Sequence, residues 1–404
     1  MTAGKTESPH PLCVDMDGTL LRTDSLDECF WAAVSQEPLL LFKLPVWLVR
    51  GRAAFKARMA PYGINSVATW PLRESVMKHI REAKSSGREV WLVTAADQQL
   101  AWALAEHLGC FDGVLASDGS TNLKGATKAR LLTDRFGKGG FDYIGDSRAD
   151  TSVWEQASRG FCVMTEDAGT RWLPDNVDPL TEKSPRLLDW LREMRVHQWS
   201  KNALLLMPML AAHAVLDLSV WLTVLAGILC MSLVASGTYF FNDCLDLDGD
   251  RRMPAKRDRP LARGDLSLRK VILVGFGLVV AGMAGAVLTD PYFALLLLGY
   301  AATSVCYSSF LKRLLLIDVL MLSGFYVWRL IMGGVLANVP LSPWFLGFAL
   351  FFFVSVALAK RYAELMVEHR EGVVAQLRRP YRQADLPVIL AFGVGSSLVT
   401  VLVL

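Results

Sequence analysis

The second half of the chain contains five long stretches without any charged side chain, and no other feature restricts its fold as strongly. They cover residues 218–241, 271–289, 291–311, 330–359 and 386–404. A helix of about 20 apolar residues crosses the hydrocarbon core of a bilayer, so most of these stretches are long enough singly. The stretch 330–359 suits two spans, because Asn338, Pro340 and Pro343 interrupt it. With two shorter segments added, we expect seven membrane helices, near 203–216, 219–241, 271–289, 291–311, 315–336, 343–359 and 386–404.

The loops between these helices alternate in their content of lysine and arginine. They lie in 242–270, 312–313 and 360–382, whereas the loops at 217, 290 and 337–342 contain none. Because positively charged loops stay on the cytoplasmic side of a bilayer, we expect a multi-pass protein of the cytoplasmic (inner) membrane. The basic loops and the N-terminal half would then face the cytoplasm. For most of these basic residues, topology alone is a sufficient explanation.

The first half of the chain has a different character, with charged residues every few positions. The whole-chain values, 52% hydrophobic residues and a net charge of +3, are averages over two unlike halves. Since the net charge is small, nothing in it indicates nucleic acid as a partner. We therefore expect an α/β domain over 1–185, a linker or interfacial segment at 186–202, and an all-α membrane domain over 203–404.

Three apolar strands in the first half end in polar residues that suit phosphate chemistry. The strands lead into Asp15, Thr94 and Asp146 and alternate with helical patterns. Such alternation predicts a parallel sheet whose ligands gather at the carboxyl ends of the strands. Asp15 could attack a phosphoryl group, and Asp17 could protonate the leaving oxygen. Asp146 would complete a Mg2+ site, because this ion needs few protein carboxylates.

A lysine would neutralise the transferred phosphate, and the residues alone favour Lys128 over Lys124. At this point the first half resembles the haloacid-dehalogenase superfamily of phosphatases. The resemblance is carried by the sequence Asp-Met-Asp-Gly-Thr at 15–19, by Thr94, by a lysine in 123–128 and by Gly-Asp-Ser-x-x-Asp at 145–150. It implies a Rossmann-like fold with a small helical cap at about 24–85.

The same resemblance implies a role for each motif residue. Asp15 would form an aspartyl-phosphate and Asp17 would be the general acid, while Thr94 and Lys128 would hold the phosphoryl group. The Mg2+ site would be formed or supported by Asp15, Asp17 (through its carbonyl), Asp146 and Asp150. A degenerate, non-catalytic domain is the alternative. Within the cap, the apolar segment 38–49 is too short to span a membrane, and we expect it to pack in the core rather than against the membrane surface.

A second group of acidic residues follows the second predicted membrane helix. Asn242, Asp246 and Asp250 are spaced by four residues, so a continuing helix would place them on one face, with Asp243 beside them. Carboxylates at a membrane edge are costly unless they bind cations, and we expect them to hold Mg2+ against a pyrophosphate. The basic stretch 251–262, which includes Lys256 and Arg257, suits the same anion. A solvated, charge-balanced loop is the alternative.

This second motif resembles Asn-Asp-x-x-Asp-x-x-x-Asp of the UbiA prenyltransferase superfamily, whose members are intramembrane enzymes with nine helices. The segments 195–202, 307–313, 326–329 and 360–365 resemble its decaprenyl-phosphate phosphoribosyltransferase branch. That branch transfers 5-phosphoribose from phosphoribosyl pyrophosphate to a polyprenyl phosphate. Our candidates for binding the phosphates are Lys312, Arg329, Lys360 and Arg361, with Lys201 and Arg195 as weaker ones. The fused phosphatase would then remove the 5-phosphate of the product.

Two alternatives to this activity stay open. The membrane half could instead be a prenyltransferase that uses a prenyl diphosphate and an aromatic or other acceptor. However, the second Asp-rich motif of aromatic prenyltransferases is missing, and Lys360, Arg361 and Glu364 stand in its place. In the other alternative, an inactive membrane half anchors the phosphatase, because we expect only about seven of the nine helices and therefore a C-terminally incomplete domain.

Overall fold

The structure, a computed structural model, describes residues 10–49, 51–118, 122–213, 216–309, 311, 314, 316–371 and 381–403. The chain forms two compact units, and each is made of two segments. The first unit contains Met1–Trp190 and Cys244–Arg269, and the second contains Leu191–Asp243 and Lys270–Leu404. The segment Cys244–Arg269, which carries Asp246 and Asp250, therefore groups with the N-terminal half and not with the helices on either side of it.

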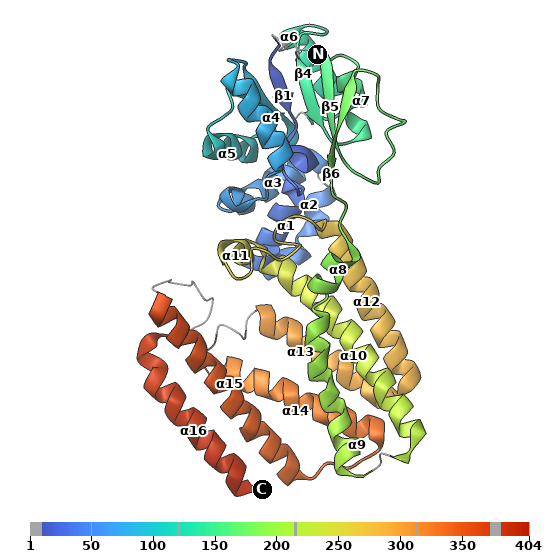
Figure 1. The fold of residues 1–404 in the computed structure, drawn as a ribbon, viewed down its shortest axis with the longest axis vertical. Helices are drawn as coiled ribbons and strands as arrows, with labels where there is room; N and C mark the ends of the chain where they lie inside the picture. Colours follow the sequence, from blue (N-terminus) through green and yellow to red (C-terminus); the bar gives the residue numbers. More distant parts are fainter. Residues whose placement is uncertain are drawn as a thin grey trace, which may run out of the picture. The chain divides into compact units, whose positions relative to one another are not determined.

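The first unit is built on a six-stranded sheet in which all strands are parallel (Figure 1). Its strand order is β3-β2-β1-β4-β5-β6, the order of a doubly wound α/β fold. In such a sheet the order reverses between β1 and β4, and ligands bind at the carboxyl ends beside this point. The strands are β1 (Leu12–Val14), β2 (Val90–Asp97), β3 (Gly113–Ser117), β4 (Asp142–Gly145), β5 (Arg159–Thr165) and β6 (Val177–Glu182).

Helices cover both faces of this sheet, and each face has its own hydrophobic core. Successive strand residues point to opposite faces, so Val14 packs with Leu92 in one core while Cys13 packs with Val93 in the other. All the helices of the first unit, including those of the cap described below, are α1 (Ser25–Gln36), α2 (Leu44–Val49), α3 (Arg52–Ile64), α4 (Glu74–Ser85), α5 (Gln98–Leu108), α6 (Ala126–Phe136), α7 (Thr151–Trp154) and α11 (Leu247–Arg252). Three short 3-10 turns are η2 (Pro38–Phe42), η3 (Val67–Thr69) and η4 (Arg148–Asp150). The predicted α/β fold is confirmed.

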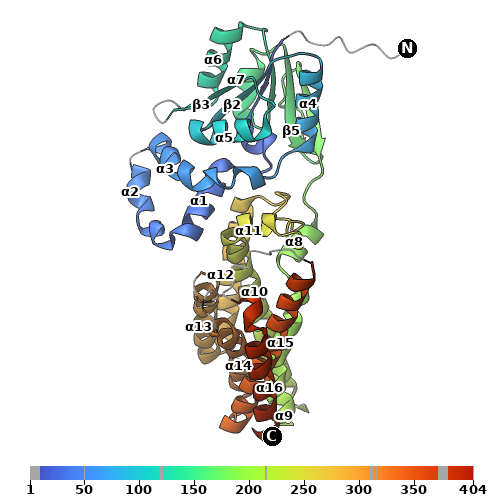
Figure 2. The same ribbon diagram turned by 90° about the vertical axis from the view of Figure 1, so that its left-hand side faces the viewer.

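The predicted cap corresponds to α1, α2 and α3 with the two turns η2 and η3, and Figure 2 shows these helices at one end of the sheet. Cys29 on α1 and Met59 on α3 join the core of the sheet, which fixes both helices to it. The apolar segment 38–49 follows the core prediction only in part. Leu40 is buried, whereas Leu39 and Phe42 in the same short turn, η2, are 74% and 81% exposed.

The segment Cys244–Arg269 is held to the rest of the first unit by ion pairs with the cap. Arg251 makes two hydrogen bonds, of 2.9 and 2.7 Å, to the carboxylate of Glu28 on α1, and both side chains are buried. Arg269 pairs with Asp24 and Asp27 at the start of the same helix. A buried, bidentate arginine–carboxylate pair is geometrically specific, so it defines where this segment lies on the unit.

The second unit is all-α, and six of its helices are long and apolar enough to cross a membrane within the described residues. They are α10 (Leu218–Leu245), α12 (Leu268–Thr289), α13 (Pro291–Ser309), α14 (Ile317–Ala337), α15 (Pro343–Glu371) and α16 (Leu386–Val403), the last preceded by the turn η8 (Gln383–Asp385). α8 (Leu187–Glu193) lies at the boundary in sequence between the two units. These six helices indicate a multi-pass membrane protein.

The helix that we expected over 203–216 is the one incorrect span. The structure has instead a 3-10 helix, η5 (Val196–Leu206), and the short helix α9 (Met207–Ala211). Pro208 near the start of α9 lacks the amide hydrogen that a continuous α-helix needs at this position. The segment is apolar, as expected, but an apolar composition does not distinguish a 3-10 helix from an α-helix.

Small residues allow the helices of the second unit to approach closely. A Cβ atom on Gly237 of α10 would lie 2.5 Å from the Gly275 carbonyl oxygen of α12. A Cβ atom on Gly333 of α14 would lie 2.3 Å from the Leu205 carbonyl oxygen of η5. Because apolar side chains gain little from leaving lipid, such close backbone packing is a main source of association between membrane helices.

The Arg251–Glu28 pair yields a stability prediction. Glu28→Gln leaves the Arg251 charge buried without its counter-charge, which costs roughly 3–5 kcal/mol. We expect faster amide hydrogen exchange in α1 and α11 of the full-length protein in detergent. Asp178→Asn is the control, because Asp178 pairs with Arg159 at the surface and such pairs contribute about 0–1 kcal/mol. Unchanged exchange in Glu28→Gln would show that the pair does not hold the segment.

Candidate active sites

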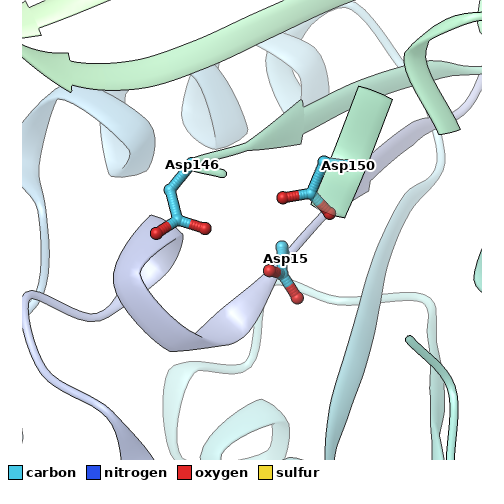
Figure 3. Close-up of side chains that lie close together, drawn as sticks. All are labelled: Asp15, Asp146 and Asp150. Atoms are coloured by element: carbon cyan, nitrogen blue, oxygen red, sulfur yellow. The ribbon is translucent and has the colours of Figure 1, made fainter. Parts of the chain in front are cut away.

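Three carboxylates meet at the carboxyl end of the sheet in the first unit. Asp15 follows β1, Asp146 follows β4, and Asp150 ends the turn η4 (Figure 3). Each offers one oxygen, and these oxygens lie within 4.8 Å of one another. Since β1 and β4 are the strands between which the order of the sheet reverses, the cluster lies where a doubly wound fold binds its ligands. Hard cations such as Mg2+ prefer oxygen ligands of this kind.

The turn after Asp15 must contain glycine. Gly18 has a φ of +73°, a conformation that L side chains rarely adopt. A Cβ atom at this position would lie 2.3 Å from Oδ2 of Asp146. The glycine therefore lets the turn Met16–Leu20 approach the carboxylate that follows β4, and it keeps that carboxylate in place.

A buried lysine compensates part of the negative charge. Lys128 on α6 is 3% exposed and donates hydrogen bonds of 2.9 Å to Oδ1 of Asp15 and 2.8 Å to the hydroxyl of Tyr143. The Tyr143 hydroxyl in turn donates to Oδ1 of Asp150 at 2.9 Å. Of the two lysines considered from the sequence, Lys128 lies at the carboxylates, whereas Lys124 is exposed. Tyr143 was not predicted, because a tyrosine inside an apolar strand gives no separate signal.

The electrostatics of this cluster favour a bound cation. Burial, and then the charges of Asp15 and Asp150, raise the pKa of Asp146 to about 8. Burial also raises the pKa of Asp15, although Lys128 opposes this effect. Burial works against the charge of Lys128, yet Asp15 and Asp150 raise its pKa overall. Because one ammonium faces three carboxylates, a divalent cation would stabilise all three in their ionised form.

Asp17 is not one of the three carboxylates of this cluster. Its Oδ1 accepts a 2.8 Å hydrogen bond from the Ser25 amide at the start of α1. Burial, followed by the charge of Asp24, raises the pKa of Asp17 to about 7, so it can hold a proton near neutral pH. Thr94 is fully buried at the end of the same sheet, and its hydroxyl accepts from the Ala96 amide at 3.0 Å.

The second acidic motif differs from its predicted geometry. α10 ends at Leu245 and α11 begins at Leu247, so the helix does not continue through Asp246. Asp246 takes the N-cap position of α11, with a φ of −98° and a ψ of 7°, and its side chain makes no capping hydrogen bond. The continuous helix expected through Asn242, Asp246 and Asp250 is therefore interrupted at Asp246.

The individual residues of this motif still have features of an ion site. Oδ1 of Asn242 is buried and has no hydrogen-bond partner within the described residues, which is rare for a buried amide oxygen unless it binds an ion or water. Asp250 is buried and pairs with Lys256 at 3.1 Å and with Arg259. Asp243 is buried and pairs with Arg195. Arg257 is exposed.

Two buried arginines in the helical unit have opposite surroundings. Arg361 on α15 donates to Asp318 at 2.9 Å and to Glu364 at 2.6 Å, so its charge is already compensated. Arg329 on α14 is 4% exposed and donates to Asn202 at 3.1 Å and to the Tyr300 hydroxyl at 2.7 Å. In the part of the chain that the structure describes, no carboxylate lies within ion-pairing distance of Arg329.

Further cations lie near Arg329. Partial burial, and then the charges of Lys360, Arg329 and Arg195, lower the pKa of Lys201 on η5. Lys360 itself is exposed on α15. Lys312, another predicted phosphate-binding residue, lies outside the described residues. Arg329, rather than Arg361, is thus the buried arginine whose positive charge is available to an anion.

Comparison with known proteins identifies both halves of the chain. A family model described as the UbiA prenyltransferase family matches residues 203–403, and one described as haloacid dehalogenase-like hydrolase matches residues 12–155. Over 217 residues the chain is 35% identical to the decaprenyl-phosphate phosphoribosyltransferase of Mycobacterium tuberculosis, covering 50% of this chain and 72% of that protein. The chain belongs to the UbiA prenyltransferase family. Its first half is a haloacid dehalogenase-like (HAD) hydrolase domain, so transferase and hydrolase folds are joined in one enzyme.

Two further similarities extend this comparison. The uncharacterized protein y4nM of Sinorhizobium fredii is 38% identical over 401 residues, which cover 98% of this chain and 77% of that protein. Similarity to that protein therefore spans both the HAD and the UbiA halves. A solved UbiA homolog from Archaeoglobus fulgidus, bound to GPP and Mg2+, is 19% identical and covers 53% of this chain and 76% of its own, with a TM-score of 0.45. Both family resemblances expected from the motifs are confirmed.

The Gly18 contact yields a prediction for cation binding. In Gly18→Ala, the new methyl group must displace the Asp146 carboxylate, and we expect Mg2+ affinity to fall roughly 10- to 100-fold, as when supporting groups of metal ligands are removed. The measurement is the Mg2+ concentration that half-activates hydrolysis of p-nitrophenyl phosphate. Gly87→Ala is the control, because Gly87 has a similar φ of +75° but no atom within 4 Å of the new Cβ. Equal effects of both variants would mean that backbone strain, not the Asp146 contact, is responsible.

Proposed function

We propose that the UbiA half transfers 5-phosphoribose from phosphoribosyl pyrophosphate to a polyprenyl phosphate, and that the HAD half removes the 5-phosphate from this lipid product. The observation that carries the transferase part is Arg329, a buried membrane arginine that is available for an anion. The similarity to the decaprenyl-phosphate phosphoribosyltransferase of Mycobacterium tuberculosis supports the choice of substrates. The Asp15–Lys128 pair at the end of the sheet supports the phosphatase part.

The phosphatase step uses two carboxyl groups in sequence. An oxygen of Asp15 attacks phosphorus, the bond from phosphorus to the C5 oxygen breaks, and Asp17 gives its proton to that oxygen. Water then attacks phosphorus, Asp17 takes a proton from the water, and the aspartyl-phosphate is cleaved to free phosphate. Lys128 holds the phosphoryl oxygens throughout, and Asp150 keeps Lys128 and Tyr143 in place.

The transferase step needs two anion sites. Asp246 and Asp250 would form the site for the departing pyrophosphate, and Lys256 and Arg259, which pair with Asp250, are suited to its oxygens. Arg329, with Lys360 and Lys201 nearby, is suited to a second phosphate, either the 5-phosphate or that of the lipid. Mg2+, when bound at either acidic cluster, supplies positive charge to phosphate oxygens.

Asp15 is the residue whose replacement tests the phosphatase step. Asp15→Asn removes the nucleophile, and we expect dephosphorylation to fall by at least about a thousandfold, so that the 5-phosphorylated lipid accumulates in membranes. Labelled phosphoribosyl pyrophosphate and thin-layer separation of the lipid products would measure this. Transfer to the lipid should persist in the same sample, which serves as an internal control. Unchanged dephosphorylation by Asp15→Asn, with no other phosphatase present, would disprove the proposed role of the HAD half.

The second prediction concerns the transferase. Asp246→Ala should abolish incorporation of label from phosphoribosyl pyrophosphate, because a carboxylate of the pyrophosphate site is lost. Hydrolysis of p-nitrophenyl phosphate by the HAD half is the matched control. Incorporation from a labelled prenyl diphosphate instead would favour an aromatic or other prenyltransferase. If neither substrate is used by the unmodified protein, the UbiA half acts only as an anchor.

A further inference from the structure

The cap carries a lysine next to the phosphatase site. Lys56 lies on α3, and its Nζ donates a 2.7 Å hydrogen bond to the carbonyl oxygen of Ala95. Ala95 directly follows Thr94 at the carboxyl end of β2. On either side of Lys56, Phe55 and Met59 pack into the hydrophobic core beneath the cap, so the position of α3 over the sheet is set by packing. The lysine is thus held by the fold near the end of the sheet where Asp15 lies.

The positive charge of Lys56 is not neutralised. Across the described residues, no carboxylate lies within 4 Å of its Nζ, and the hydrogen bond to Ala95 is to a neutral carbonyl group. Burial is the main cause that lowers the pKa of Lys56; the charges of Asp17, Asp24 and Asp15 oppose this, and that of Lys124 adds to it. A half-buried ammonium group without a close counter-ion is poorly stabilised, and an arriving anion would stabilise it.

Lys56 can also leave its present partner at little cost. The Ala95 carbonyl accepts a second hydrogen bond, of 3.0 Å, from the hydroxyl of Ser117. The carbonyl therefore keeps a partner when the lysine turns away, and the large cost of an unsatisfied buried acceptor is avoided. The flexible four-carbon stem of lysine allows its ammonium group to turn toward a ligand.

We propose that Lys56 binds a second anionic group of the phosphatase substrate, so that the site selects phosphomonoesters that carry a phosphodiester or another phosphate. Lys124, exposed just before α6, adds positive charge near the same position. This inference deepens the proposed function and rests on it for the natural substrate. In a polyprenyl-phosphoryl-5-phosphoribose, the 5-phosphate would react at Asp15 and the phosphodiester would be the group that Lys56 binds.

The test compares two soluble substrates that differ by one phosphate, ribose 5-phosphate and ribose 1,5-bisphosphate, with the full-length protein in detergent. We expect Lys56→Met to raise KM for the bisphosphate roughly 10- to 100-fold more than KM for the monophosphate, as expected for loss of a charge-assisted hydrogen bond. Lys56→Arg should restore much of this preference, since it keeps the charge. Lys78→Met is the matched control, because Lys78 is an exposed lysine on α4.

The outcomes separate this inference from the proposed function. Equal changes in KM for both substrates, or a loss of kcat alone, would show that Lys56 only supports the fold and would overturn the inference. Purified polyprenyl-phosphoryl-5-phosphoribose is the third substrate. If it is not hydrolysed while the Lys56-dependent preference for the bisphosphate persists, the inference stands and the proposed lipid substrate is wrong.

Discussion

Repulsion between three carboxylates that meet at the carboxyl end of the sheet is the main electrostatic constraint on the candidate site of the first unit. Asp15, Asp146 and Asp150 come from separate positions in the chain, and the parallel sheet brings them within 4.8 Å. One ammonium group, from Lys128, balances part of their charge, and Tyr143 connects it to Asp150. Gly18 allows the turn after β1 to approach Asp146 closely. The cluster itself lies at the ends of β1 and β4, where the order of the sheet reverses. The arrangement is costly without a cation and a phosphate, and it is therefore suited to binding both.

The same electrostatic rule distinguishes residues within the helical unit. Arg361 is buried with Asp318 and Glu364, which makes it part of a closed ion-pair group that also includes the hydroxyl of Tyr381. Arg329 is buried with neutral partners only, namely an amide oxygen, a phenol and a backbone carbonyl. A charge buried in a membrane protein requires compensation, and where the protein supplies none, a ligand is the natural source. The two buried arginines therefore differ in one respect: carboxylates of the protein compensate the charge of Arg361, whereas Arg329 has only neutral partners.

The segment between α10 and α12 carries two aspartates of the second acidic motif, yet it groups with the first unit. These aspartates are Asp246 and Asp250, and the segment also packs on the HAD cap through Arg251 and Glu28. Glu28 lies on α1, and the first amide of α1 binds the carboxylate of Asp17. One helix, α1, therefore contacts both Asp17 and the segment that carries Asp246 and Asp250.

Sequence and tertiary structure determined different parts of this protein. Charge-free stretches and the alternation of strands with helices predicted the two fold classes, because both depend on local periodicity. Short motifs indicated both families, and they pointed to Asp15, Asp146 and Lys128, which the structure brings together. The 3-10 helix at Val196–Leu206, the break at Asp246 and the ion pairs of Arg251 and Arg361 were not predictable. They depend on partners far away in the chain, such as Glu28 and Asp318, and only the packed structure decides which charges meet and which remain available for a ligand.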